Sequence, residues 1–116
     1  MKSVFTIFFM LIVGLGFSQE CDLNEALNKL STTTSDAERA ELELDLGKCY
    51  RENGKRDSAI FYLEKARIIC YEIEDSKLLQ DVLFYLGTVY YETENGLAAI
   101  DCFSEALKIE PGFTAD

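Results

Sequence analysis

The chain has 116 residues, of which 48% are hydrophobic and 28% are charged, so it can form one small domain and is not composed like a disordered protein. Its 21 Asp and Glu residues outnumber its 11 Lys and Arg residues, which gives a net charge of -10. Clustered Lys and Arg bind phosphate backbones and anionic lipids, so this charge excludes nucleic acid as an expected partner and argues against adsorption to an anionic membrane. An acidic surface mainly keeps a protein soluble.

Residues 1–18 are expected to be a secretory signal peptide rather than part of the fold. A lysine precedes an apolar run over residues 4–17, which is shorter than the about 20 residues of a membrane span. Gly16 and Ser18 are small residues suited to cleavage before Gln19. We therefore expect a secreted or periplasmic protein, with a retained membrane anchor as an alternative.

Export would place the four cysteines in an oxidising compartment, where disulfides form. Four cysteines can pair completely in three different ways. The chain has no histidine and no C-x-x-C motif, so neither a metal site nor a redox motif is expected. Lipidation of the first cysteine is a further alternative, although Glu20 before it does not fit a lipobox. The four are Cys21, Cys49, Cys70 and Cys102.

The chain matches itself when residues 46–69 are laid over residues 86–109, with eight identical positions and no gap. Self-similarity at a fixed period indicates stacked copies of one supersecondary unit. The identical pairs are Leu46/Leu86, Gly47/Gly87, Tyr50/Tyr90, Glu52/Glu92, Ala59/Ala99, Ile60/Ile100, Ala66/Ala106 and Ile69/Ile109.

The residue types in this repeat predict two antiparallel helices joined through a seam of small side chains. Gly47 costs about 1 kcal/mol of helix propensity and is tolerated where a second helix approaches the backbone closely. Ala59 and Ala66 are two turns apart on the following segment and are small for the same reason, while Tyr50 fills the space between them.

Turn and cap residues indicate where the helices begin and end. Asn53-Gly54 supplies the turn within the first unit, and Asp57 is expected to cap its second helix. Residues 22–30 read as a short helix inside an N-terminal capping segment, residues 19–34. A capping box at residues 35–38 starts the next helix, so we expect five helices after the signal peptide.

This pattern resembles the tetratricopeptide repeat. Residues 35–116 would hold two units, at about 40–73 and 80–113, with Glu43 and Leu83 at the usual tryptophan positions. The resemblance implies an all-α fold of antiparallel helical hairpins stacked as a short right-handed solenoid. The matching residues are Leu46, Gly47, Tyr50, Ala59 and Ala66 in the first unit, and Leu86, Gly87, Tyr90, Ala99, Phe103, Ala106 and Pro111 in the second.

The spacing of 40 residues is longer than the family's period of about 34. The six extra residues, Glu74 to Leu79, lie between the units and include a helix end and a new cap. We expect them to lengthen the flanking helices. The alternative is a bulged linker that tilts the units apart.

The resemblance implies a protein or peptide partner, bound on a concave face built from the first helix of each unit. For Phe84 and Tyr85 the alternative is packing on the neighbouring repeat, so we weigh both roles for them. Neither a small-molecule substrate nor a cofactor is expected. The residues carried over to this face include Lys48, Arg51, Asp81, Phe84, Tyr85, Thr88 and Tyr91.

The chain is not expected to be an enzyme, because it has no histidine, no G-x-S-x-G motif and no glycine-rich phosphate loop. The leading hypothesis is an exported interaction scaffold. The alternative is the N-terminal sensory or assembly segment of a larger membrane-associated regulator. Solenoids usually have about three repeats and a polar terminal cap, whereas this sequence has two and a half repeats and no C-terminal cap. We expect it to be a piece of a longer array, and the alternative is an exposed C-terminal end that packs on a partner or self-associates with a second copy.

Cys49 is expected on the side of its helix that faces the preceding helix, which Cys21 opens. A Cys21–Cys49 disulfide would hold that helix in place, and a small buried Cys49 is the alternative. Cys70 and Cys102 are separated by roughly 12 Å along their parallel helices and are expected to stay unpaired.

Overall fold

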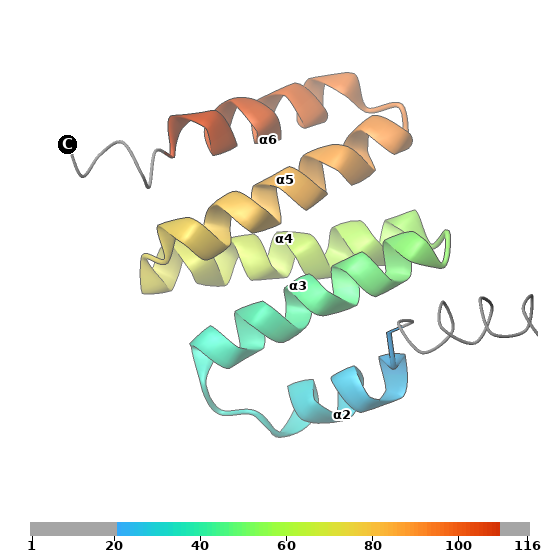
Figure 1. Cartoon of the computed structure of the whole chain (residues 1–116), viewed down its shortest axis with the longest axis vertical. Coiled ribbons are helices and arrows are strands. Elements are labelled where there is room, and N and C mark those ends of the chain that lie inside the picture. Colours follow the sequence, from blue (N-terminus) through green and yellow to red (C-terminus); the bar gives the residue numbers. More distant parts are fainter. Residues whose placement is uncertain (1–20, 110–116) are drawn as a thin grey trace, which may run out of the picture.

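The computed structural model describes residues 21–109, and this part of the chain folds as an all-α stack of five helices without a strand (Figure 1). The predicted all-α helical repeat fold is therefore confirmed. The expected signal peptide and Pro111 lie outside the described residues. The helices are α2 (Leu23–Thr32), α3 (Asp36–Glu52), α4 (Arg56–Ile73), α5 (Ser76–Glu92) and α6 (Gly96–Lys108).

Each helix packs on the next one in the chain, and α3 also contacts α5 (Figure 1). The helices therefore pair as two hairpins, α3 with α4 and α5 with α6, while α2 covers one side of α3. The two hairpins are regularly spaced. α3 begins at residue 36 and α5 at residue 76, while α4 begins at residue 56 and α6 at residue 96.

The seam of small side chains lies where each hairpin closes. A Cβ atom on Gly47 would overlap the side chain of Leu63 on α4, and one on Gly87 would lie 2.9 Å from Cε1 of Phe103 on α6. Contacts this short require a shift of the neighbouring side chain, so the missing side chain lets the helices approach. Ala59 and Ala66, on the other side of the first seam, are completely buried.

Ser35 caps α3 as predicted, but the reciprocal bond of a capping box does not form. The carboxylate of Glu38 accepts from the hydroxyl of Thr33, and the N–H of Ser35 donates to Thr33 Oγ1 at 3.3 Å. Ser35 accepts a hydrogen bond from the backbone N–H of Glu38 at 3.2 Å. Asp75 does the same for α5, accepting from the N–H of Leu78 at 3.0 Å. These bonds satisfy backbone donors that have no partner inside the helix.

The prediction that Asp57 caps α4 is wrong. α4 already begins at Arg56 and has Lys55 at its N-cap, and no side chain of the described residues makes the capping hydrogen bond. Asp57 therefore lies in the first turn, where the positive end of the helix dipole stabilises its negative charge. The equivalent end of α6 is capped by Asn95, which accepts from the N–H of Ala98 at 3.3 Å.

The six extra residues form a short connection and the beginning of a helix. Glu74 ends α4 with a left-handed φ of 56°, Asp75 is the cap, and Ser76 to Leu79 are the first turn of α5. α3 and α5 consequently begin at residues 36 and 76, four residues before the repeat motifs at about 40 and 80. A two-residue connection leaves no bulged linker between α4 and α5.

Candidate protein-interaction surface

The predicted binding residues on α3 already contact α5. The ammonium group of Lys48 lies over the ring of Tyr85, 4.7 Å from its centroid. Arg51 donates two hydrogen bonds to the carboxylate of Glu92, at 3.0 and 2.8 Å. These hydrogen bonds hold the pKa of Glu92 below its usual value. Lys48 and Arg51 therefore join the two units in the structure rather than facing solvent unpaired.

The corresponding residues of α5 are arranged differently. Phe84, Thr88 and Tyr91 follow one another at spacings of four and three residues, which places them on one face of the helix. We call these three residues the α5 stripe. Thr88 donates a hydrogen bond to the backbone carbonyl of Phe84 at 2.8 Å, and Asp81 lies exposed one turn before the stripe.

Tyr85 and Phe84 differ in role: one packs on the neighbouring repeat and the other is exposed to solvent. Tyr85 is half-buried, packs against the core and lies beneath Lys48, so it serves the contact between the repeats. Phe84 points outward and touches Tyr85 edge-on, with ring centroids 5.5 Å apart, and Phe103 of α6 at 6.2 Å. Phe84 is the residue of this pair that remains available to a partner.

A comparison of equivalent positions shows why the α5 stripe is uncovered. Leu44 of α3 is 5% exposed, whereas Phe84, at the equivalent position of α5, is 56% exposed. The side chain of Arg51 is 33% exposed, whereas Tyr91 is 73% exposed. The second unit covers these positions of the first unit, whereas nothing within residues 21–109 covers the equivalent positions of the second unit.

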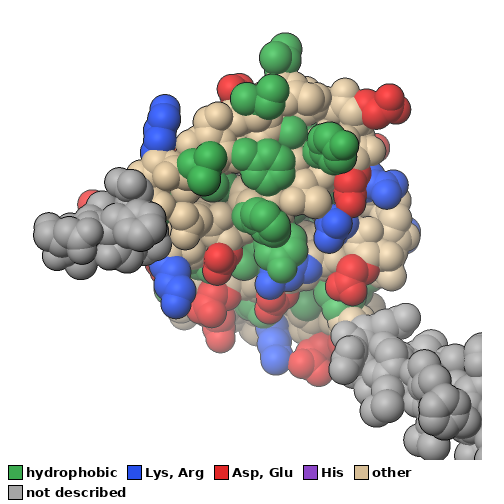
Figure 2. Space-filling model, turned by 45° about the horizontal axis from the view of Figure 1, so that its top comes forward, with side chains coloured by type: hydrophobic (Ala, Val, Ile, Leu, Met, Phe, Trp, Pro, Cys, Tyr) green, Lys and Arg blue, Asp and Glu red, His purple; other side chains and the backbone are tan. Residues whose placement is uncertain are grey.

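The last helix repeats this difference. The side chain of Arg67 on α4 is 28% exposed, whereas Leu107, at the equivalent position of α6, is 79% exposed. Ile60 is half-buried and Ile100 is 60% exposed. Figure 2, in which the α6 side of the molecule is turned forward, shows hydrophobic side chains gathered on this face with charged side chains around them.

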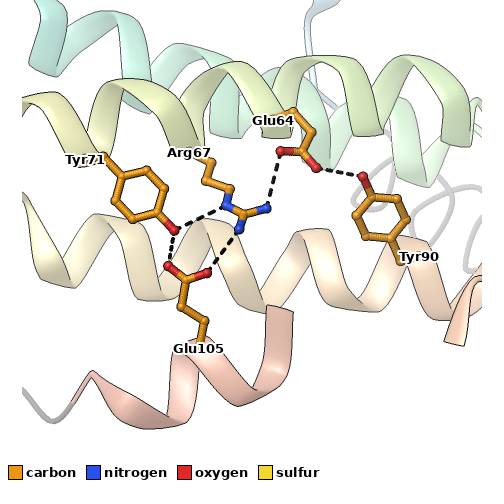
Figure 3. A network of polar contacts seen from close by, with 5 residues as sticks. All are labelled: Glu64, Arg67, Tyr71, Tyr90 and Glu105. Carbon is orange, nitrogen blue, oxygen red and sulfur yellow. Dashed lines mark hydrogen bonds and ion pairs between the residues drawn. The ribbon is translucent and has the colours of Figure 1, made fainter. Parts of the chain in front are cut away.

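A polar network fixes the second unit against the first (Figure 3). Arg67 donates hydrogen bonds to Glu64 at 3.5 Å and to Glu105 at 3.1 Å. Tyr71 also donates to Glu105, and Tyr90 donates to Glu64 at 2.6 Å. Burial and the bond to Glu64 raise the pKa of Tyr90 above its usual value. The network therefore joins α4, α5 and α6 through protonated tyrosines and one shared guanidinium group.

Glu43 is a buried carboxylate in the core of the first unit. One of its oxygens, Oε1, is enclosed and has no hydrogen-bond partner among the described residues. Burial raises the pKa of Glu43, while Lys65 and Arg39 oppose the shift. The second unit has a completely buried Leu83 at this position, which is the usual side-chain type for a packed core.

The structure joins Cys21 to Cys49 in a disulfide whose Cα atoms are 5.6 Å apart. This bond ties the chain just before α2 to the last turn of α3. Within the described range, Cys70 and Cys102 are buried free thiols, and burial raises the pKa of each to about 11. Thiols with such pKa values are poor nucleophiles at neutral pH.

Among residues 21–109, no group of three or more His, Cys, Asp or Glu side chains is placed to hold a metal ion. In the same part of the chain, no helix is both long and apolar enough to cross a membrane. The most exposed apolar residues of the described range lie on α5 and α6.

Residues 44–66 match the tetratricopeptide repeat family. The match spans the second half of α3, the turn at Gly54 and the first half of α4, and it includes the seam described above. Searches of curated proteins and of solved structures gave no match. The matched repeat supports a tetratricopeptide repeat protein and a role in protein–protein interaction, and repeats of this kind are typically non-enzymatic scaffolds.

An uncapped C-terminal end was expected from the sequence, but the exposed apolar residues of α6 were not identified. The exposed residues of α6, Leu97, Ile100 and Leu107, were not assigned to any site. The alignment of the two units contains the signal that reveals them, because Leu107 stands where the first unit has Arg67. When an exposed position is apolar although its equivalent inside the stack is polar, it indicates a surface that binds another molecule or segment.

Proposed function

We propose that the protein is an exported interaction scaffold that binds a peptide or helix of a partner protein on the concave face built from the first helix of each unit, α3 and α5. The observation that supports this most directly is the α5 stripe, where Phe84 and Tyr91 are exposed about two turns apart on one face of the helix. Aromatic residues dominate the binding energy of protein interfaces because they bury a large area with few rotatable bonds.

The surroundings of the α5 stripe favour a neutral or basic ligand. The chain has a net charge of -10, and Asp81 lies one turn before Phe84 on the same helix. Lys48 is held over Tyr85 and Arg51 is bonded to Glu92, so the nearby cations are already engaged. A partner helix with apolar residues at spacings of three and four could pack along the stripe.

Affinity capture with a matched pair of variants tests this proposal. The double substitution Phe84→Ala and Tyr91→Ala is expected to abolish capture of the partner while the helical circular dichroism signal is retained. The control is Phe61→Ala on α4, because Phe61 and Phe84 are almost equally exposed but lie on different helices. Equal capture by both variants would remove the stripe from consideration.

We also propose that the protein is exported, and that its repeats are longer than the period of about 34 residues typical of the family. The Cys21–Cys49 disulfide supports export, because disulfides persist in oxidising compartments. The self-match of residues 46–69 with residues 86–109 and the helix bounds support the longer spacing. The intact mass of the protein isolated from outside the cytoplasm is expected to correspond to a chain that begins at Gln19, and a mass that includes residues 1–18 would contradict cleavage there.

A further inference from the structure

The two ends of the described helical stack have opposite character. All the exposed residues of α2 are polar, and its leucines are half-buried against α3. At the other end, the outward face of α6 carries an apolar row at spacings of three and four residues. The row consists of the apolar residues Leu97, Ile100 and Leu107, with Ser104 between the last two, and all are exposed. We call these four residues the α6 stripe.

We propose that the α6 stripe binds the same stripe of a second copy of this chain, giving a two-fold symmetric dimer. A head-to-tail contact would place the apolar α6 stripe against the polar face of α2, which does not match it. An isologous contact pairs apolar with apolar and closes after two copies. The proposal goes beyond the partner binding on α5, since neither interaction requires the other.

The residues of α6 are arranged symmetrically about Ser104. Ile100 and Leu107 lie four residues before it and three after it, while Asp101 and Lys108 lie three before it and four after it. An antiparallel crossing at Ser104 therefore brings each Ile100 to the Leu107 of the other copy. The small Ser104 side chain at the crossing allows the two backbones to approach closely.

The same crossing pairs opposite charges. Asp101 and Lys108 are exposed beside the stripe and form no ion pair with the described residues. In the antiparallel arrangement each Asp101 lies near the Lys108 of the other copy. A parallel arrangement would instead place like charges together, which disfavours it.

The size of the contact sets its strength. α6 has 13 residues, so it is about 20 Å long and presents less area than a standard stable interface requires. We therefore expect a reversible dimer whose fraction rises with protein concentration, rather than a permanent one.

Sedimentation equilibrium of the purified protein over a wide concentration range tests the proposal. Wild type is expected to dimerise, and Ile100→Glu is expected to raise the dissociation constant at least about tenfold. The control is Ile68→Glu on α4, because Ile68 and Ile100 have nearly equal exposure. A monomer at every concentration would overturn the proposal, and the stripe would then be covered by another protein or by residues 110–116. Equal weakening by both substitutions would also overturn it.

A charge exchange tests the orientation. Asp101→Lys alone is expected to weaken the dimer, and adding Lys108→Asp is expected to restore it, because the paired charges are then only interchanged. A double variant that stays as weak as the single one would contradict the antiparallel pairing. Loss of partner capture in the Phe84 and Tyr91 variant without loss of the dimer would show that the two surfaces act independently.

Discussion

Replacing Glu43 by leucine is expected to stabilise the protein, because it removes a buried carboxylate whose Oε1 has no hydrogen-bond partner within residues 21–109. An unsatisfied buried polar group costs about 1–3 kcal/mol, and more when it is charged. Leucine has a similar size and is the residue that the second unit carries at this position, as Leu83. We expect Glu43→Leu to raise the free energy of unfolding by about 1–3 kcal/mol at neutral pH.

The effect of Glu43→Leu should depend on pH in a defined direction. The pKa of Glu43 is raised in the folded protein above the ordinary value of 4.5, by burial, and Lys65 and Arg39 limit the shift. Above the raised pKa, both folded and unfolded chains carry the charge and the folded state bears the full cost of burying it. As the pH falls through the raised pKa towards 4.5, the folded state takes up the proton first and the cost disappears. The advantage of the leucine variant should therefore shrink on acidification.

Thermal and urea unfolding, followed by circular dichroism at a series of pH values, measures this difference. Each 1 kcal/mol corresponds to a rise in melting temperature of about 4–8 °C for a domain of this size. Glu41→Leu on the exposed side of the same helix is the control, and it should change the stability by no more than about 0.5 kcal/mol. A Glu43→Leu protein less stable than wild type, or a gain that is the same at acidic and neutral pH, would refute the reasoning.

Three further predictions concern the seam, the network and the disulfide. Gly87→Ala should lower the free energy of unfolding by about 1–3 kcal/mol in urea, because the added Cβ meets Phe103 and the gain in helix propensity is smaller than the strain; greater stability would contradict the seam. Arg67→Met should cost about 1–2 kcal/mol in the same assay by removing the cation that Glu64 and Glu105 share, so that each keeps only its tyrosine donor, and an unchanged midpoint would show that the network is dispensable. A thiol assay on the unreduced protein should find two free thiols and a Cys21–Cys49 bond, whereas four free thiols would contradict the disulfide.

The helices and their pairing could be predicted from the sequence because the signals are local and repeated. Gly47 and Gly87 stand at equivalent positions of the two units, and both prove to be the points where a side chain of the partner helix fills the space of a missing Cβ. The N-cap at Ser35 is equally local, since its bond joins residues three positions apart. The error at Asp57 arose because Lys55, which has no capping side chain, occupies the position before α4.

The binding surface could be predicted only in outline, because exposure depends on which elements pack on one another. Arg51 and Tyr91 were assigned to the same concave face by their equivalent repeat positions. The structure covers the first with α5 and leaves the second exposed, and this follows from the order of the units in the stack. The bond between Arg67 and Glu105 joins residues 38 positions apart and has no local signature.

Site-specific photo-crosslinking in the producing cell tests the proposed scaffold most directly. A photoreactive phenylalanine analogue placed at Tyr91 should form a specific adduct with a partner protein, because this side chain is exposed on the α5 stripe. The same analogue placed at Phe61, which is also exposed but lies on α4, should not form that adduct. Adducts that are identical at both positions, or absent at Tyr91, would contradict the account of α5 as the partner-binding helix.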